Sequence, residues 1–291
     1  MPQRVKESGV FWMLVSVLSF SLMQLFVTMT SEAVSVYLQI FFRNLAGIFV
    51  AGFCIRKEKL SWFGQRREQP YLFGRSIAGF LGLLFFFQAS RTADIADATI
   101  VNRTGPFFTT LFSALFLREK VTLVQWGALL AVFAGGLISA DPAFDSSALP
   151  MLYALLSAVA NGAAYTLLSY FRNHVPAMTV IMHFSVFSAA ASIPFLLGNF
   201  SLPSARDGIM LIMIALLGSC GQISITLAYR LAPASEISIF DQLSVVLSVL
   251  LGWLFLHQQP TANTFIGGSI VIAASVFIYF YYQWRHAGGS L

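Results

Sequence analysis

Residues 9–28 read GVFWMLVSVLSFSLMQLFVT, a run of 20 residues that contains no charged side chain. An α-helix rises about 1.5 Å per residue, so a run of this length can cross the ~30 Å hydrocarbon core of a bilayer. A transmembrane β-strand would instead be about 10 residues long and would alternate apolar with polar positions. Arg4 and Lys6 precede the run, as in a signal peptide, but it is longer than the apolar part of such a peptide. We therefore predict that it forms the first membrane-spanning helix and stays in the mature protein.

Nine further apolar runs of similar length follow the first one along the chain. Short stretches that are polar or contain Pro and Gly separate them. The predicted spans are residues 9–28, 36–55, 71–90, 96–117, 122–140, 149–170, 177–198, 208–229, 235–256 and 263–282. Only 10% of the 291 residues are charged, against about 25% in soluble domains. We predict an all-α integral membrane protein with ten transmembrane helices.

Lys and Arg are distributed unevenly between the two sides of the predicted bundle. Short cytoplasmic loops of membrane proteins are enriched in these residues. If the N-terminus is cytoplasmic, thirteen of the 17 Lys and Arg residues fall on the cytoplasmic side, Arg75 among them. Only Arg91 and Arg206 fall on the outer side, while Arg43 and Arg103 lie inside spans. We therefore expect a multi-pass protein of the cell (inner) membrane with both termini in the cytoplasm.

The chain matches itself when it is shifted by 139 residues. The informative matches pair Gly79 with Gly218, Gly82 with Gly221, Arg91 with Arg230, Asp97 with Glu236, and Thr122 with Thr261. This shift places the third span on the eighth, so each half has five spans. An odd number inverts the second half relative to the first, as in many secondary transporters, whose substrate site lies near the midplane. We predict two inverted five-helix halves, residues 1–140 and 149–291.

The stretch from Pro106 to Gly136 reads PFFTTLFSALFLREKVTLVQWGALLAVFAGG. It contains a proline inside a span, a Leu-Arg-Glu at the cytoplasmic end of that span, and a following Gly-rich span. This pattern resembles the end of the first repeat in EamA transporters of the drug/metabolite transporter (DMT) superfamily, and Arg43 also matches a family position. The resemblance covers nearly the whole chain as two EamA repeats. It implies a ten-helix inner-membrane carrier, usually an exporter of metabolites or amino acids, in which spans five and ten pack outside the central cavity.

The second half departs from the family pattern at two positions. Gln258 stands where the pattern has Glu, and Val245 stands where it has Pro. Members of this family move very different solutes, so the resemblance specifies the fold more closely than it specifies the substrate.

Polar side chains near the outer side of the membrane midplane form the first candidate set. Arg43 and Arg103 each lie roughly 4 Å to the outer side of their span centres at a helical rise of 1.5 Å per residue, and Asn102 precedes Arg103. Ionisable groups in hydrocarbon are costly and generally face a cavity or a partner. We expect the arginines to hold an anionic group such as a substrate carboxylate, with Asn102 and the mid-span Asn161 as further substrate-binding residues. The alternative is that an arginine bonds a backbone carbonyl or another helix.

A second candidate set lies nearer the cytoplasmic side. It contains His183 and Asp241, each roughly 7 Å to the inner side of its span centre, and Gln242. A desolvated Asp or a His can change its protonation state near neutral pH. We therefore predict that Asp241 or His183 couples transport to a proton gradient, and that Gln242 contributes to substrate binding.

The sequence lacks the motifs that are typical of several classes of function. We find no catalytic nucleophile motif, no P-loop and no Cys/His cluster, so we predict no catalytic residues, no cofactor and no metal site. The basic residues between 56 and 67 are interpreted as positive charge beside anionic lipid, not as a nucleic-acid surface. We expect a monomer or a homodimer whose partners are the lipid bilayer and a small-molecule substrate.

The favoured function is therefore a secondary-active exporter of an amino acid or related carboxylate, working by alternating access and coupled to protons, and not an enzyme. One alternative is an intramembrane enzyme that acts on lipid, with Asp241 and His183 as an acid–base pair. The other is an importer of the same class of solute, because the direction of transport depends on gradients and gating.

Overall fold

The computed structural model describes residues 3–31, 33–92, 101–102, 104–140, 148–171, 174–198, 202–257 and 262–287. All regular secondary structure in these residues is helical. Seven of the helices are long and apolar enough to cross a membrane, and three shorter apolar helices accompany them. Length and composition in this part of the chain are thus those of a protein with several membrane-spanning helices.

The helices of the first half begin and end close to the predicted spans. They are α1 (Gln3–Met29), α2 (Val36–Glu58), α3 (Gln69–Thr92), α5 (Gly105–Phe116) and α6 (Leu123–Ala140), with a short 3₁₀ helix, η1 (Arg66–Glu68), before α3. Ser35 caps α2, because its hydroxyl accepts a hydrogen bond from the amide of Leu38. Only part of the predicted fourth span can be compared, since residues 93–100 and Arg103 lie outside the described residues.

The second half contains α7 (Ala148–Tyr170), α8 (Ala177–Gly198), α9 (Ala205–Leu231), α10 (Ala234–Ile237), η3 (Ser238–Gln242), α11 (Leu243–Leu256) and α12 (Ala262–Ala287). The predicted ninth span, 235–256, is not one helix but three consecutive pieces. The hydroxyl of Ser244 donates to the main-chain carbonyl of Asp241, which competes with the regular helical pattern. Irregular backbone at membrane depth is tolerated where protein covers it, and the side chains of Ser238, Phe240 and Gln242 are buried.

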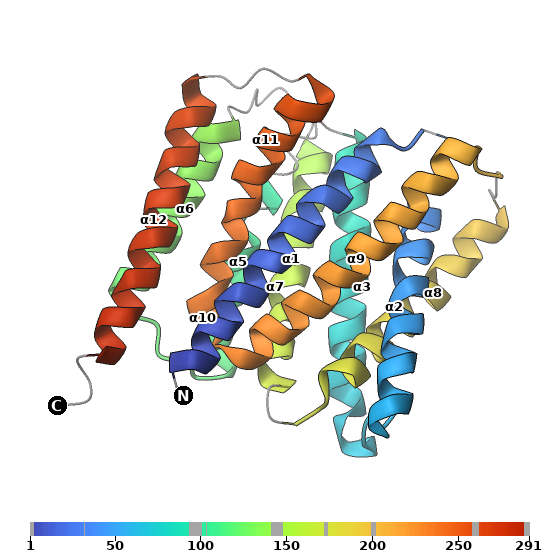
Figure 1. The fold of residues 1–291 in the computed structure, drawn as a ribbon, viewed down its shortest axis with the longest axis horizontal. Helices are drawn as coiled ribbons and strands as arrows, with labels where there is room; N and C mark the ends of the chain where they lie inside the picture. Colours follow the sequence, from blue (N-terminus) through green and yellow to red (C-terminus); the bar gives the residue numbers. More distant parts are fainter. Residues whose placement is uncertain are drawn as a thin grey trace.

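Helices of one half pack mainly on helices of the other. The main pairs are α1 with α9, α3 with α7, α2 with α8, and α6 with α12. Figure 1 also shows that α1 and α7, the first helices of the two halves, run in opposite directions, and that α1 begins at the end of the bundle where α12 ends. The pair α6 and α12 stands at one edge of the bundle (Figure 1), in agreement with the expectation that spans five and ten pack outside.

Two glycines that the repeat pairs with each other allow close approach between the halves. Gly82 on α3 lies against the side chain of Asn161 on α7, and a Cβ at Gly221 on α9 would lie only 2.7 Å from the ring of Phe20 on α1. Small residues at helix interfaces let backbones approach closely in membranes. The two contacts therefore fix the α3–α7 and α1–α9 pairs in equivalent ways.

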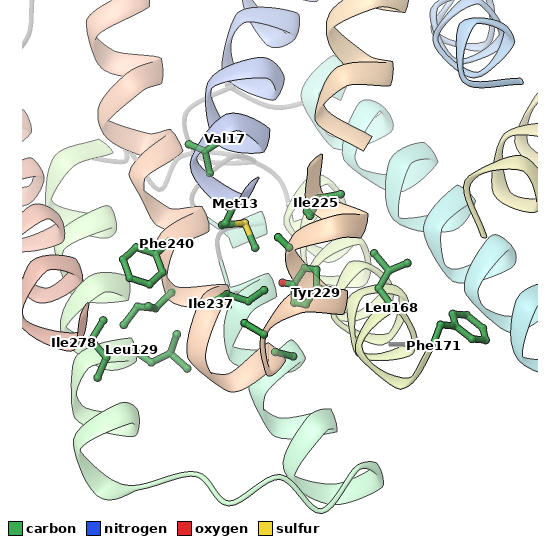
Figure 2. Packing of buried hydrophobic residues seen from close by; sticks show 14 of the residues in the cluster. Met13, Val17, Leu129, Leu168, Phe171, Ile225, Tyr229, Ile237, Phe240 and Ile278 are labelled. Carbon is green, nitrogen blue, oxygen red and sulfur yellow. The ribbon is translucent and has the colours of Figure 1, made fainter. Parts of the chain in front are cut away.

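The largest cluster of buried apolar side chains lies toward the end of the bundle where α1 begins. It joins Met13 and Val17 of α1 to Ile225 and Tyr229 of α9, and it continues through Phe240 of η3 to α6 and α12. Figure 2 shows these side chains turned toward one another from the different helices. The cluster therefore ties both halves together on this side of the polar groups described below.

Candidate functional site

Arg43 on α2 lies inside the bundle, with 8% of its surface exposed. Its Cζ lies 5.4 Å from the centroid of the Phe20 ring on α1. One terminal nitrogen, Nη2, donates a long hydrogen bond of 3.5 Å to Oε1 of Gln222 on α9. The Nε atom is buried and has no hydrogen-bond partner among the described residues. Arg43 therefore keeps an unused donor in a place that water does not freely reach.

The surroundings of Arg43 hold its side chain in this position. The side chain passes over Gly218 of α9, where a Cβ would lie 2.6 Å from Cγ of Arg43. Gln222, one turn further along α9, donates from Nε2 to the hydroxyl of Thr226 at 3.3 Å, which directs its carbonyl oxygen toward the guanidinium. The path of Arg43 therefore depends on a glycine and an amide contributed by the opposite half.

Arg75 on α3 is a second arginine inside the bundle, with only 2% of its surface exposed. The sequence places Arg75 on the cytoplasmic side, within the predicted span 71–90, and does not single it out as a candidate; packing against α8 buries its side chain. Its Cζ lies 4.1 Å from the centroid of the Phe184 ring on α8, and its guanidinium occupies the space beside Gly79. Both Nε and Nη1 are buried without a hydrogen-bond partner among the described residues.

The two buried guanidinium groups interact electrostatically with each other. Each lies close enough to Tyr165 of α7 to interact with it electrostatically, and Arg43 and Arg75 are close enough to affect one another. The ring of Tyr165 stacks on that of Tyr229 of α9, with centroids 5.2 Å apart. We call Arg43 and Arg75 the arginine pair.

His183 on α8 borders the arginine pair. Its Nδ1 shares a hydrogen bond of 2.8 Å with the hydroxyl of Ser76 on α3, next to Arg75 in the chain. The imidazole ring meets the ring of Phe73 edge to face, with centroids 4.7 Å apart. It is 5% exposed and within electrostatic range of Arg75. His183 therefore lies beside Ser76 and within electrostatic range of Arg75, and its predicted part in proton coupling stays a prediction.

Asp241 and Gln242 lie in η3, at the break between α10 and α11. Asp241 is half-buried and within electrostatic range of Tyr229, while Gln242 is only 1% exposed. Because Tyr229 stacks on Tyr165, two aromatic rings connect the surroundings of Asp241 with the arginine pair.

Asn102 and Asn161 meet each other at Ser157 of α7. Asn102 donates to the Ser157 hydroxyl at 2.7 Å and Asn161 donates at 3.3 Å, while that hydroxyl donates to the carbonyl of Gly82 at 2.6 Å. Contacts within the protein thus use an amide donor of each asparagine, which is the pattern of a helix–helix link. The other residue predicted for this layer, Arg103, lies outside the described residues.

Sequence reasoning missed Arg75 and Tyr165 and gave little weight to Gln222. One signal was available for Arg75: Gly79, four residues later, is one of the glycines that the internal repeat matches. A glycine one turn along a helix leaves room for a long side chain to fold back against the helix. In the part of the chain that the structure describes, no three His, Cys, Asp or Glu side chains gather as a metal site would require.

Comparisons with known proteins agree on one family and one fold. Residues 7–140 and 148–280 each match the model of the EamA-like transporter family. The pseudopaline exporter of Pseudomonas aeruginosa is 28% identical over 273 residues, which cover 93% of this chain and 95% of the exporter. Human solute carrier family 35 member G1 is 29% identical over 285 residues, with 92% of this chain and 77% of that protein covered.

A riboflavin transporter of Rhizobium johnstonii is 27% identical over 278 residues, which cover 93% of this chain and 90% of the transporter. A solved crystal structure superposes with a TM-score of 0.83 at 18% sequence identity, covering 96% of this chain and 98% of the other. At that identity the likeness establishes the fold alone. The relatives with names that state an activity are transporters or exporters, and none of these three is an enzyme.

Proposed function

Because the chain belongs to the EamA-like transporter family, we propose that it is a secondary-active carrier that exports a small metabolite such as an amino acid or a related carboxylate. The observation that carries this proposal is Arg43, a guanidinium buried between the two halves with an unused donor at Nε. An ionised side chain at membrane depth is expensive unless it has a partner or a task. A carboxylate that accepts charge-assisted hydrogen bonds from Arg43 would supply both.

The proposed topology has ten membrane-spanning helices, with residues 1–140 and 149–291 as inverted halves. Two observations support this arrangement. Helices α1 and α7, the first of each half, run in opposite directions (Figure 1). Helix α1 also packs on α9 of the second half, as α7 packs on the equivalent helix α3 of the first half. The excess of Lys and Arg in one set of loops supports placing both termini in the cytoplasm of a cell whose inner membrane holds the protein. Alternating access then consists of rocking one half against the other around the polar region.

Export is the proposed direction because one relative over nearly the full length of both chains is named an exporter. The lipid-directed enzyme considered as an alternative has no support, since the family and its named members are transporters.

Proton coupling is assigned to His183 and Asp241. His183 is hydrogen-bonded to Ser76 and lies beside Arg75, so its protonation would respond to an anion that arrives near the arginine pair. Asp241 lies in the irregular part of the ninth span, where discontinuous helices in transporters often hold coupling ions. Each group lies on a helix of the second half and faces residues from other helices.

Transport by the full-length chain reconstituted into lipid vesicles tests the proposal. The vesicles are loaded with unlabelled amino acids, mono- and dicarboxylates or cationic compounds, and counterflow of the labelled solute is measured with and without a pH gradient. We expect counterflow for at least one carboxylate, stimulated by the gradient, and a reduced rate with Arg43→Gln. Counterflow for no solute, with protein that is folded and inserted, would overturn the assignment as a carrier.

A further inference from the structure

Arg43 of α2 and Gln222 of α9 meet at a place where the main chain of α9 is held on both neighbouring helices. The hydroxyl of Ser219, one turn before Gln222, donates to the main-chain carbonyl of Arg43 at 3.4 Å. The hydroxyl of Ser16 on α1 donates to the main-chain carbonyl of Gly221 at 3.1 Å. These bonds position α9 around Gln222, so the contact of its amide with the guanidinium follows from the packing of helices of opposite halves.

The orientation of the Gln222 amide follows from its hydrogen bonds with Thr226. The hydroxyl of Thr226 donates its hydrogen to the main-chain carbonyl of Gln222, at 2.7 Å. A hydroxyl has one hydrogen and two lone pairs, so Thr226 can still accept from Nε2 of Gln222, at 3.3 Å, but cannot donate to that amide as well. Oε1 is therefore the amide atom directed at Arg43, and it accepts from Nη2.

The bond to Gln222 leaves Arg43 incompletely satisfied. Its length, 3.5 Å, exceeds the length of about 2.7–3.2 Å that is usual for N–H···O bonds. An amide oxygen is also uncharged, so it accepts a hydrogen bond without neutralising the cation. Within the described residues no Asp or Glu contacts the guanidinium, and its Nε has no hydrogen-bond partner. A buried charge without a counter-ion is costly, and a carboxylate bound in place of the amide would remove that cost.

We propose that Gln222 is an internal competitor of the substrate: its amide oxygen binds Arg43 in the empty carrier and is displaced by the anionic group of the substrate. This proposal rests on the proposed function, in which Arg43 binds a carboxylate, and adds the residue that competes for the same donor. The exchange is favourable because a charge-assisted hydrogen bond is about twice as strong as one to a neutral acceptor. Because amide and guanidinium come from opposite halves, the exchange also breaks a polar contact between α2 and α9.

A purely structural role for Gln222 predicts different behaviour. If the amide served only to hold α2 against α9, a carboxylate at position 222 would serve better, because it would form charge-assisted bonds with Arg43. The side chain of Arg43 is also confined by Gly218 and by the ring of Phe20, independently of the amide. An internal competitor must instead be uncharged, since a carboxylate at position 222 would remain bound to Arg43 and exclude the substrate.

A stability cycle without any ligand tests whether Arg43 accepts a carboxylate at this position. Gln222→Glu, Arg43→Gln and the double variant are unfolded in a denaturing detergent as purified full-length proteins. Gln222→Glu should be tolerated beside Arg43 and should destabilise the Arg43→Gln protein, which lacks the cation. We expect a coupling of at least about tenfold in the unfolding equilibrium constant. A double variant that does not fold, where both single variants fold, shows the same coupling, and additive effects would overturn the proposal.

Binding of small carboxylates tests the exchange itself. The probes are acetate, propionate and benzoate, each compared with its neutral amide at matched ionic strength, and the rise in unfolding temperature with concentration gives the affinity. Gln222→Glu should weaken carboxylate binding at least about tenfold, because the introduced carboxylate takes the charge pair with Arg43. Gln222→Met has a similar shape and no competing acceptor, so it should tighten carboxylate binding about two- to tenfold, the range of one hydrogen bond. Gly208→Ala on the same helix is the control, since nothing lies within 4 Å of its new Cβ.

Opposite effects of Gln222→Glu and Gln222→Met distinguish an internal competitor from a structural amide. Loss of carboxylate affinity in both variants, or unchanged affinity in both, would overturn the proposal, and so would wild-type protein that binds none of the three carboxylates. Counterflow of a carboxylate by Gln222→Glu at the wild-type rate refutes this inference and leaves the carrier assignment intact. The expected binding results with protein that carries no solute in vesicles refute the carrier and leave the site.

Discussion

The substitution Gly218→Ala perturbs Arg43 without removing any polar group. The new Cβ would lie 2.6 Å from Cγ and 3.1 Å from Cδ of Arg43, and 3.0 Å from Sδ of Met23. Carbon atoms prefer separations of about 3.5–4.0 Å, so the stem of Arg43 must move by roughly 1 Å. Overpacking of this kind costs about 1–3 kcal/mol, while replacing a helical Gly by Ala contributes about 0.4–1 kcal/mol of stability. The net expectation is destabilisation by about 0–2.6 kcal/mol.

Gly208→Ala on the same helix provides the matched control, because nothing lies within 4 Å of the Cβ that it introduces. It should stabilise the protein by up to about 1 kcal/mol, so the two variants should differ by about 1–3 kcal/mol. The assay is unfolding in a denaturing detergent followed by circular dichroism, with transport of a carboxylate measured on the same preparations. Gly218→Ala should also slow transport, and Gly208→Ala should not. Equal stability and equal transport in the two variants would refute the view that Gly218 positions Arg43.

Three further substitutions test other parts of the structure. Asp241→Asn should abolish stimulation of transport by a pH gradient while leaving counterflow at equal pH, and a transport rate that still follows the gradient would show that Asp241 does not couple protons. Ser157→Ala removes the hydroxyl that Asn102 and Asn161 share. It should destabilise the protein by about 1–3 kcal/mol and leave substrate affinity unchanged. A large loss of affinity would instead assign the Ser157 hydroxyl and the two asparagines to the substrate site. Asp207→Ala removes a carboxylate that accepts from the amide and hydroxyl of Ser31 and from the Ser204 hydroxyl. Loss of these bonds between α9 and the end of α1 should lower stability, measured by the same detergent titration; unchanged stability would show that the bonds do not hold the two helices together.

The positions of most helices could be predicted because hydrocarbon imposes a simple rule. Every buried main-chain amide and carbonyl must be satisfied within the helix, so an uncharged apolar run of about 20 residues has one stable conformation in the membrane. The predicted 36–55 and the observed α2, Val36–Glu58, illustrate the agreement. Helix α2 continues to Glu58 because residues beyond the hydrocarbon can remain helical, and a hydropathy pattern does not predict that extension.

The break in the ninth span could not be predicted by the same rule. Residues 235–256 are apolar enough to form one helix, and composition alone gives no reason for the 3₁₀ segment Ser238–Gln242. The break depends on a side-chain bond from Ser244 to the Asp241 carbonyl and on protein that covers the irregular turn. Both are tertiary effects that a single-sequence pattern does not contain.

One arginine of the candidate site could be predicted from the sequence and the other could not. Arg43 was predicted inside the membrane because it interrupts an apolar run, whereas Arg75 was counted with the charges of the cytoplasmic side because it lies near the start of one. Burial of Arg75 depends on the packing of α3 against α8 and on the contact with Phe184, which local hydropathy does not show. The role predicted for Arg103 stays a prediction, since that residue lies outside the described part of the chain.

The internal repeat relates the glycines but not the arginines, and this difference bears on mechanism. Gly79 and Gly218 occupy equivalent positions, yet the residues that the 139-residue shift assigns to Arg43 and Arg75 are Met182 and Ile214. Both buried charges therefore belong to the first half, while the second half contributes the glycine, the amide and one of the aromatic rings that surround them. In the function proposed above, the anion would stay with the first half as the halves rock, because charge-assisted bonds to guanidinium outweigh contacts with apolar groups. The second half would then control access to that anion, so substitutions at Gly218 or Phe184 should change rates more than affinities.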